Sequence, residues 1–263
     1  MEGMIFCCPL CGEPLVREEH RAVCSQGHSF DIARQGYVHL LPVNKMHSKL
    51  PGDSREMVDS RRRFLEAGYY APFREELCRI VRECAQDLGS REGEGLTLCD
   101  AGCGEGYYTA GLWRALPQAA VCGFDISKLA VKAAAGKYKG IEFGVASSFA
   151  IPLGTGRVHL LTDVFSPLAP EEFARVVRPG GYFLYAVPGE RHLYGLKEIL
   201  YRNPYENPHR DTEYAGFRFQ GRRAVRGEIF IPNGETARDL FAMTPYYWKT
   251  QPEGPRRLEE TQG

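Results

Sequence analysis

The sequence has no apolar run close to the ~18 residues that a membrane-spanning helix needs, so we expect no membrane insertion. Its first residues, Met1-Glu2-Gly3-Met4, lack the basic start and the hydrophobic stretch of a signal peptide. The chain also lacks a charge excess, because 33 Lys and Arg residues balance 33 Asp and Glu residues. Without a net field that draws it to nucleic acid, any RNA affinity has to come from local patches.

Nine cysteines in a chain without export features predict a reducing compartment, where thiols bind metals or lie in the core and seldom form disulfides. We therefore expect a cytoplasmic protein. At 263 residues the chain is long enough to bury one sizeable α/β core and to carry a small additional module.

A glycine-rich stretch lies between a short apolar run and a segment with helical spacing: Leu98-Cys99-Asp100-Ala101-Gly102-Cys103-Gly104-Glu105-Gly106-Tyr107. The apolar run predicts a buried strand that ends at Asp100, and the alternate glycines allow positive φ and let a ligand lie against bare backbone. The G-x-G-x-G spacing favours S-adenosylmethionine over a dinucleotide, because Asp100 would repel phosphate but can accept a hydrogen bond from an ammonium group. An ordinary strand-to-helix turn is the alternative interpretation.

Strands and helices alternate after this loop, with strands expected at residues 120–125, 141–145, 158–165 and 182–187. Asp125 ends the first of these, where nucleoside-binding folds hydrogen-bond the ribose hydroxyls. Ser127 is expected to cap the helix that follows this strand. Ser147 follows the next strand, where a polar side chain can reach adenine, and Phe165-Ser166-Pro167 is expected beside the transferred methyl group. The alternation predicts a doubly wound, mostly parallel α/β sheet of the Rossmann-like methyltransferase kind.

Near the N-terminus three cysteines and one histidine have the spacing of a zinc site, C-x2-C-x12-C-x3-H: Cys8, Cys11, Cys24 and His28. This closed tetrahedral set leaves no open position for water, so it predicts a structural zinc. A disulfide pair and chance clustering are the competing interpretations, and Cys7 adjoins the first knuckle although Cys8 fits its two-residue gap. Residues 30–33 and 37–41 are expected to be short strands that complete this module.

Basic residues gather directly after the zinc module: Lys45, His47, Lys49, Arg55, Arg61, Arg62 and Arg63. Such a run is either a solvated linker and helix face or a phosphate-contacting patch beside the zinc module. Helices are expected at residues 59–67 and 73–86, with a break between them.

Taken together, the motifs resemble the bacterial 23S rRNA (guanine-N1)-methyltransferases of the RlmA type over roughly residues 4–250. The zinc set, combined with the Gly-Cys-Gly-Glu-Gly-Tyr-Tyr-Thr loop and Arg-His-Leu, is far more specific than the glycine loop alone. The residues that carry the resemblance are the four zinc-site residues, Phe30-Asp31, Gly36-Tyr37, Pro51-Gly52-Asp53-Ser54, Arg61-Arg62, Phe64-Leu65, Gly68, Tyr70, the stretch from Asp100 to Thr109, Asp125-Ile126-Ser127-Lys128, Val145-Ala146-Ser147-Ser148, Arg175-Val176-Val177-Arg178-Pro179-Gly180-Gly181, Pro188-Gly189, Arg191-His192-Leu193 and Met243-Thr244-Pro245.

The resemblance implies that Gly104 and Glu105 contact S-adenosylmethionine and that Tyr70 and His192 close over it. From the residues alone, Tyr70 would be a packing aromatic and His192 a helix N-terminal residue without a ligand. The resemblance also implies methyl transfer to N1 of a guanine in a 23S rRNA hairpin, and a homodimer with a shared RNA cleft. Neither the residues nor the resemblance identifies the general base.

We expect four regions: a zinc-binding module at 1–42, a basic helical linker region at 43–95, an S-adenosylmethionine-dependent methyltransferase domain at 96–250 and an irregular tail at 251–263. Family members continue after Met-Thr-Pro into a last strand, whereas this tail has no strand pattern, so residues 218–231 are expected to form an antiparallel strand without its partner. Two other functions stay open: a methyltransferase of the same fold acting on a small metabolite, and a non-enzymatic zinc RNA-binding protein.

Overall fold

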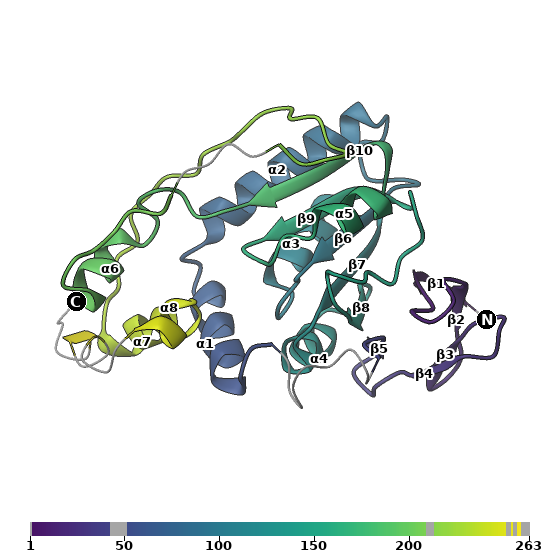
Figure 1. Cartoon of the computed structure of the whole chain (residues 1–263), viewed down its shortest axis with the longest axis horizontal. Coiled ribbons are helices and arrows are strands. Elements are labelled where there is room, and N and C mark those ends of the chain that lie inside the picture. The colour runs from purple at the N-terminus through teal and green to yellow at the C-terminus, as the bar shows by residue number, and fades with distance from the viewer. Residues whose placement is uncertain (1, 43–51, 209–212, 251–253, 255–256, 259–263) are drawn as a thin grey trace. The chain divides into compact units, whose positions relative to one another are not determined.

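The computed structural model describes residues 2–42, 52–208, 213–250, 254 and 257–258 (Figure 1). The chain divides into two compact units. The first unit comprises Met1–Asp53, Arg74–Ala186 and Glu213–Phe219, and the second comprises Ser54–Phe73, Val187–Thr212 and Gln220–Gly263. In the described part of the chain, no helix combines the length and apolarity needed to cross a bilayer.

The first unit is built on a six-stranded sheet with the order β10-β9-β6-β7-β8-β5. All its neighbouring strands are parallel, which confirms the predicted doubly wound sheet. The strands are β5 (Val38–His39), β6 (Thr97–Ala101), β7 (Ala120–Asp125), β8 (Glu142–Val145), β9 (Val158–Val164) and β10 (Val177–Ala186). The helices of this unit are most of α2 (Ala71–Asp87), α3 (Tyr107–Ala115), α4 (Lys128–Lys137) and α5 (Pro170–Val176).

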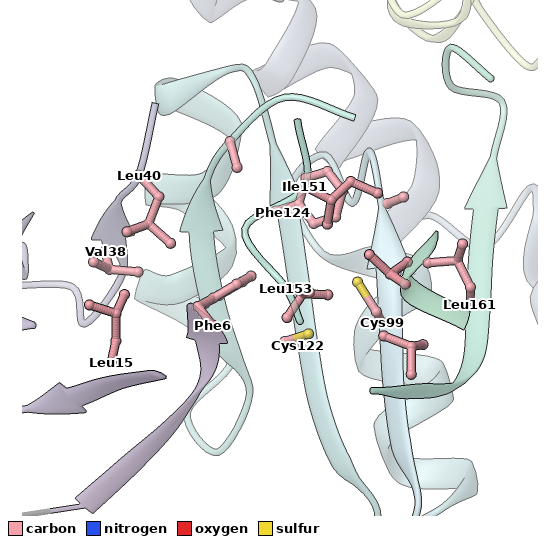
Figure 2. Close-up of a cluster of buried hydrophobic side chains, with 14 of the residues drawn as sticks. Phe6, Leu15, Val38, Leu40, Cys99, Cys122, Phe124, Ile151, Leu153 and Leu161 are labelled. Atoms are coloured by element: carbon pink, nitrogen blue, oxygen red, sulfur yellow. The ribbon is translucent and has the colours of Figure 1, made fainter. Parts of the chain in front are cut away.

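The central strands are buried because their sequences are almost wholly apolar, as a parallel sheet covered on both faces requires. Their core includes the cysteines Cys99 and Cys122, which are neighbours in the register of β6 and β7 and behave as small apolar side chains (Figure 2). Among the described residues no cysteine forms a disulfide. The carboxyl ends of these strands therefore form a rigid edge on which a site can be built.

A second, antiparallel sheet of the first unit carries the N-terminal motif, in the order β1-β2-β3-β4. Its strands are β1 (Glu2–Cys7), β2 (Pro14–Arg17), β3 (Arg21–Val23) and β4 (Ser29–Asp31). The Glu142 carboxylate at the start of β8 accepts hydrogen bonds from the backbone N–H groups of Ile5 and Phe6 at 3.1 and 3.0 Å. The Phe6 side chain packs over Gly144, where a Cβ would lie 3.0 Å from the ring. Figure 2 shows Phe6 extending from β1 toward the central strands.

Residues 37–41, expected to complete the zinc module, pair with it through an antiparallel bridge between Ile32 and Val38, but they also join the central sheet. Val38–His39 forms β5, which pairs in parallel with β8 at the edge of the central sheet. Leu40 continues this pairing by donating its N–H to the carbonyl of Val145 at 2.9 Å. The strand thus connects the end of the N-terminal module to the central sheet.

The second unit is helical, with α1 (Arg55–Glu66), α6 (Tyr194–Leu200), α7 (Gly234–Ala242) and α8 (Tyr246–Lys249). Ser54 and Asn233 cap α1 and α7, each accepting a hydrogen bond from a backbone N–H of the first turn. The Arg63 guanidinium joins these two helices through a two-pronged ion pair with the nearly buried carboxylate of Asp239. Phe64, Leu240 and Phe241 belong to the apolar cluster between the helices.

Two further expectations differ from the structure. Residues 218–231 are described in full and form no strand, so they do not extend the sheet beyond β10. The strand expected at residues 182–187 begins earlier, at Val177, so Arg178-Pro179-Gly180-Gly181 lies inside β10, whose register against β9 is interrupted between Val177 and Tyr182. Because residues 218–231 add no strand beside it, β10 is an edge strand of the sheet in the described chain.

Candidate cofactor site and metal site

The glycine-rich loop follows β6 at the carboxyl edge of the central sheet. Gly102, Gly104 and Gly106 all have positive φ, at 70°, 55° and 83°, so the predicted use of the glycines for left-handed backbone is confirmed. The N–H groups of Gly102 and Cys103 both donate to the carbonyl of Phe124 at 2.9 Å, which holds the loop against the end of β7. Gly106 ends the turn as the N-cap of α3.

Gly102 also permits a close approach between two strand ends. A Cβ at this position would lie 2.3 Å from the Ser166 Oγ and 2.4 Å from the Ser166 Cβ. The Ser166 hydroxyl is fixed there, 3.2 Å from the Ala101 carbonyl and 2.6 Å from a carboxylate oxygen of Asp163. The exit of β9 therefore lies directly against the glycine loop, as expected for the strand beside the methyl group.

Asp100 lies at the base of the loop and is buried to 1 % exposure. Its two carboxylate oxygens accept hydrogen bonds from the hydroxyls of Thr109 at 2.6 Å and Thr162 at 2.7 Å. Burial raises the pKa of Asp100 to about 6, and the two hydroxyls oppose that shift. The structure therefore makes Asp100 an internal anchor between α3 and β9, while its predicted contact with a ligand ammonium group stays a prediction.

Asp125 lies at the carboxyl end of β7 and is partly exposed. Its carboxylate accepts hydrogen bonds from the N–H of Gly104 at 3.0 Å and from the N–H of Ser127 at 2.8 Å. Ser127 caps α4, as predicted, by accepting from the N–H of Ala130. The acid thus orders both the glycine loop and the start of the next helix.

The other residues predicted to bind the cofactor differ in exposure. Gly102 and Ser147 are partly exposed, whereas Gly104 and Glu105 are buried within the loop. The Ser147 hydroxyl lies just after β8 and accepts a hydrogen bond from the N–H of Phe149 at 3.2 Å. Of the residues predicted to bind the cofactor at this edge, a ligand can therefore reach Gly102, Asp125 and Ser147 in the described conformation.

Tyr70 and His192 come together in the second unit. The Tyr70 hydroxyl lies 2.8 Å from the His192 Nε2, and the two rings meet edge to face at a centroid distance of 6.1 Å. Burial, followed by the Lys197 charge, lowers the pKa of His192 to about 4, so the imidazole is neutral at neutral pH. The two residues, 122 positions apart in the sequence, contact each other, and their closure over a cofactor stays a prediction.

The four N-terminal residues with zinc spacing gather around one point. The metal-ligating atoms of Cys8, Cys11, Cys24 and His28 all lie within 4.8 Å of one another. The Cys11 and Cys24 sulfurs are 3.7 Å apart, and the His28 Nδ1 lies 3.5 Å from the Cys8 sulfur and 3.4 Å from the Cys24 sulfur. Ligands around a tetrahedral zinc are about 3.5–3.8 Å apart, so the donor set fits this metal in both chemistry and spacing.

One feature at the carboxyl edge of the sheet was missed by the sequence analysis, the hydrogen-bonded pair formed by Asp163 and Ser166. Asp163 is fully buried, and its Oδ2 has no hydrogen-bond partner among the described residues. Burial raises its pKa to about 6. Phe165, between the two, is one of two non-glycine residues with positive φ in the described chain, at 55°. The only sequence signal was one acid within an apolar strand, which is too weak to assign.

Two families match the chain. A family described as the N-terminal zinc ribbon of RlmA matches residues 6–49, and a methyltransferase domain family matches residues 98–181. The first contains the four clustered zinc-site residues, and the second begins in β6 and covers the glycine loop and the strands β7, β8 and β9. The matches coincide with the two motifs found in the sequence and the structure.

Relatives cover nearly the whole chain. A 23S rRNA (guanine(748)-N1)-methyltransferase of Streptomyces fradiae is 33% identical over 97% of this chain and 90% of its own length. A protein of Micromonospora griseorubida, provisionally named a 23S rRNA (guanine-N1)-methyltransferase, is 34% identical over 93% and 87%. YxjB of Bacillus subtilis strain 168, with the same provisional name, is 25% identical over 97% and 91%. The chain therefore belongs to the family of 23S rRNA (guanine-N1)-methyltransferases, S-adenosylmethionine-dependent enzymes with an N-terminal zinc ribbon.

Proposed function

We propose that the protein transfers a methyl group from S-adenosylmethionine to N1 of a guanine in a hairpin of 23S rRNA. The observation that carries this proposal is the presence, in one unit, of a four-ligand zinc cluster and an ordered G-x-G-x-G loop. A methyltransferase acting on a small metabolite would have no use for the zinc ribbon. The names of the relatives support the same substrate.

Three partly exposed residues at the strand ends are proposed to contact the cofactor. The carboxylate of Asp125 is suited to the ribose hydroxyls, the Ser147 hydroxyl to the adenine edge, and the Gly102 backbone to the methionine part. The bound cofactor supplies an electrophilic methyl group on a sulfonium centre. The carboxylates of Asp100, Glu105 and Asp125 lie in or beside the loop, which suits a cationic nucleoside and disfavours a pyrophosphate.

Buried residues of the site are proposed to hold this arrangement. Asp100, with its two threonine hydroxyls, fixes the base of the loop, and Gly104 donates its N–H to Asp125. We retain Glu105, Tyr70 and His192 as proposed cofactor residues on the resemblance to the family. Because the pKa of His192 is lowered, its imidazole is neutral and does not repel a sulfonium.

The position and chemistry of guanine N1 determine what the residues at the exit of β9 have to provide. Guanine N1 lies on the Watson–Crick edge, so the base has to be unpaired before it reaches the site. Phe165 is 41% exposed at this exit and is proposed to stack on the base, with the Ser166 hydroxyl at its polar edge. N1 also has to lose its proton as the new bond forms, which requires a hydrogen-bond acceptor within reach.

The zinc module and a set of exposed arginines are proposed to bind the RNA substrate. Cys8, Cys11, Cys24 and His28 would hold a structural zinc that shapes the N-terminal module, because their set leaves no open position. Arg218, Arg222, Arg223 and Arg226 are exposed and suited to phosphate contacts, while Lys45, His47 and Lys49 lie outside the described residues. A homodimer with a shared RNA cleft and a cytoplasmic site of action follow from the family precedent as parts of this proposal.

Primer extension on 23S rRNA tests the function, because a methyl group on guanine N1 blocks the pairing that reverse transcription needs. We expect rRNA from a deletion strain to lack one strong stop that the parent strain shows. Incubating the deletion-strain rRNA with the purified protein and S-adenosylmethionine should restore that stop, and the Asp125→Ala variant should restore it far more slowly. An unchanged stop pattern between parent and deletion strains would contradict the assignment.

A further inference from the structure

The first unit contains a cavity of about 300 Å³ that the proposed cofactor site does not account for. It lies between the first zinc knuckle, which contributes Pro9 and Leu10, and the loop of residues 147–153 that connects β8 toward β9. Of the residues assigned above to the cofactor, only Ser147 lines it. The cavity is therefore adjacent to the adenine end of the cofactor site and separate from the glycine loop.

The knuckle wall is a tight hydrogen-bonded turn. Cys8 donates its N–H to the Glu13 carbonyl and Gly12 donates its N–H to the Cys8 carbonyl, both at 2.8 Å. The turn keeps Leu10 at its tip, where the side chain is 59% exposed. Because Cys8 and Cys11 flank this residue, the metal cluster fixes the position of the wall.

The opposite wall is held by one arginine. The Arg175 guanidinium donates to the carbonyls of Ile151 at 2.8 Å and Leu153 at 2.7 Å, and to both carboxylate oxygens of Glu172 at 2.6 and 2.7 Å. Glu172 in turn accepts from the N–H of Ile151 at 2.7 Å. This rigid loop nevertheless leaves the ring of Phe149 68% exposed. Phe149 and Leu10 are thus two exposed apolar side chains that line the same cavity, and together they indicate a binding surface.

The two walls are joined, so the cavity is preformed. The N–H of Cys7 donates to the Pro152 carbonyl at 2.8 Å, which links β1 directly to the loop. Beside this link the Arg157 side chain packs over Gly154, where a Cβ would lie 2.9 Å from the Arg157 Cγ and 3.9 Å from the Cys7 sulfur. Arg157 is exposed and has no ion-pair partner in the part of the chain that the structure describes. A cation thus lies beside a cavity whose lining combines apolar side chains with the polar Ser147, Glu172 and Arg175.

We propose that this cavity binds an unpaired nucleobase of the RNA substrate, other than the target guanine, which stacks on Phe149 against Leu10 while Arg157 contacts its phosphate. The inference rests on the proposed RNA substrate. A nucleotide combines the features that the cavity offers to a ligand, because its flat apolar face suits Phe149 and its anionic phosphate suits the cation at the rim. The Ser147 hydroxyl is the polar atom available to the edge of the base. An aliphatic peptide would use the apolar walls but not the exposed cation.

The test uses the zinc-loaded protein and hairpins of the 23S rRNA target region, each carrying 2-aminopurine at one unpaired position. We expect one position whose fluorescence is quenched by the wild-type protein but not by Phe149→Ala. This variant should bind the hairpin about 5- to 150-fold more weakly, the usual loss when one stacking partner is removed, and Phe149→Trp should bind like the wild type. Phe230→Ala, which removes a ring that is 73% exposed in the second unit, is the matched control and should change neither readout.

Arg157→Ala should reduce the magnitude of the slope of the logarithm of the RNA-binding constant against the logarithm of the salt concentration by about one. The quenching of 2-aminopurine fluorescence should be unchanged in this variant. If Phe149→Ala binds the hairpin as tightly as the wild-type protein and quenches the 2-aminopurine fluorescence equally, the inference is overturned. This holds even if the wild-type protein methylates the rRNA. An equal loss of S-adenosylmethionine affinity in Phe149→Ala without RNA would also overturn it, since the cavity would then belong to the cofactor. If the wild-type protein neither methylates nor binds 23S rRNA, the proposed function itself fails.

Discussion

Replacing Gly102 by alanine should disrupt the cofactor loop, for two independent reasons. The residue has a φ of 70°, where an L side chain is strained, and the added Cβ would lie 2.3 Å from the Ser166 Oγ. The left-handed conformation costs about 1–2 kcal/mol. Overpacking against a fixed neighbour costs about 1–3 kcal/mol more. We therefore expect Gly102→Ala to lower the free energy of unfolding by about 2–5 kcal/mol, a large share of the 5–15 kcal/mol typical of a domain.

The clash part of this cost can be isolated with a second substitution. Ser166→Gly removes both atoms that the new Cβ would meet, the Oγ and the Cβ of Ser166. The double variant should therefore be more stable than the sum of the two single losses predicts, by at least about 1 kcal/mol. Gly136→Ala is the matched control, because Gly136 lies in α4 and a Cβ there would meet only the Gln35 Cγ at 3.9 Å. Alanine in this helix should stabilise by about 0.5–1 kcal/mol.

Urea unfolding followed by tryptophan fluorescence measures these differences. The sequence has two tryptophans, and a Trp248→Phe background leaves Trp113 on α3, the helix that follows the glycine loop. A loss below about 1 kcal/mol for Gly102→Ala, or simple additivity with Ser166→Gly, would refute the reasoning that the two strand ends meet at this glycine.

Three other predictions follow from the site. Cys24→Ser should abolish zinc binding by elemental analysis and disorder residues 5–40, whereas Cys84→Ser, outside the cluster, should retain the metal; full retention in Cys24→Ser would contradict the ligand set. The pKa of Asp100 is raised to about 6, so the folded protein keeps a proton that the unfolded chain loses near pH 3.8, and stability falls as the pH rises between these values. Asp100→Asn removes this term, so urea unfolding should show the variant gaining about 2 kcal/mol relative to the wild type between pH 4 and pH 7; a constant difference would contradict the raised pKa. Asp125→Ala should raise the Kd for S-adenosylmethionine at least about tenfold by calorimetry, since it removes both the proposed ribose partner and the anchor of Gly104; an unchanged Kd would exclude this acid from the cofactor site.

The sheet could be predicted from the sequence because each strand carries its own signal. The apolar run before Asp125 predicted β7 with the bounds that the structure has, and Ser127 predicted the start of α4 by its capping chemistry. The zinc cluster was likewise predictable, since its spacing is local within each knuckle and the chemistry of the ligands restricts the choice. Short-range patterns of this kind predict the local structure correctly because tertiary packing favours the same conformation.

What could not be predicted depends on pairing between distant segments. Val38–His39 is too short to show to which sheet it belongs, and only its pairing with β8 decides this. Residues 218–231 contain apolar positions with strand-like character, yet the described chain provides no strand to pair with them beyond β10. The contact of Tyr70 with His192 and the closure of Asp163 on Ser166 also require the folded chain, because neither pair follows a motif that the residues alone define.

The central claim, methyl transfer to guanine N1 of 23S rRNA, is tested most directly by mass spectrometry with methyl-deuterated S-adenosylmethionine. The purified protein is incubated with this donor and with 23S rRNA from a deletion strain, and the rRNA is then digested to nucleosides. The proposed function predicts about one deuterated methyl group per rRNA molecule, carried by 1-methylguanosine. Deuterium in another nucleoside, or none in the rRNA although the protein binds the donor, would contradict it.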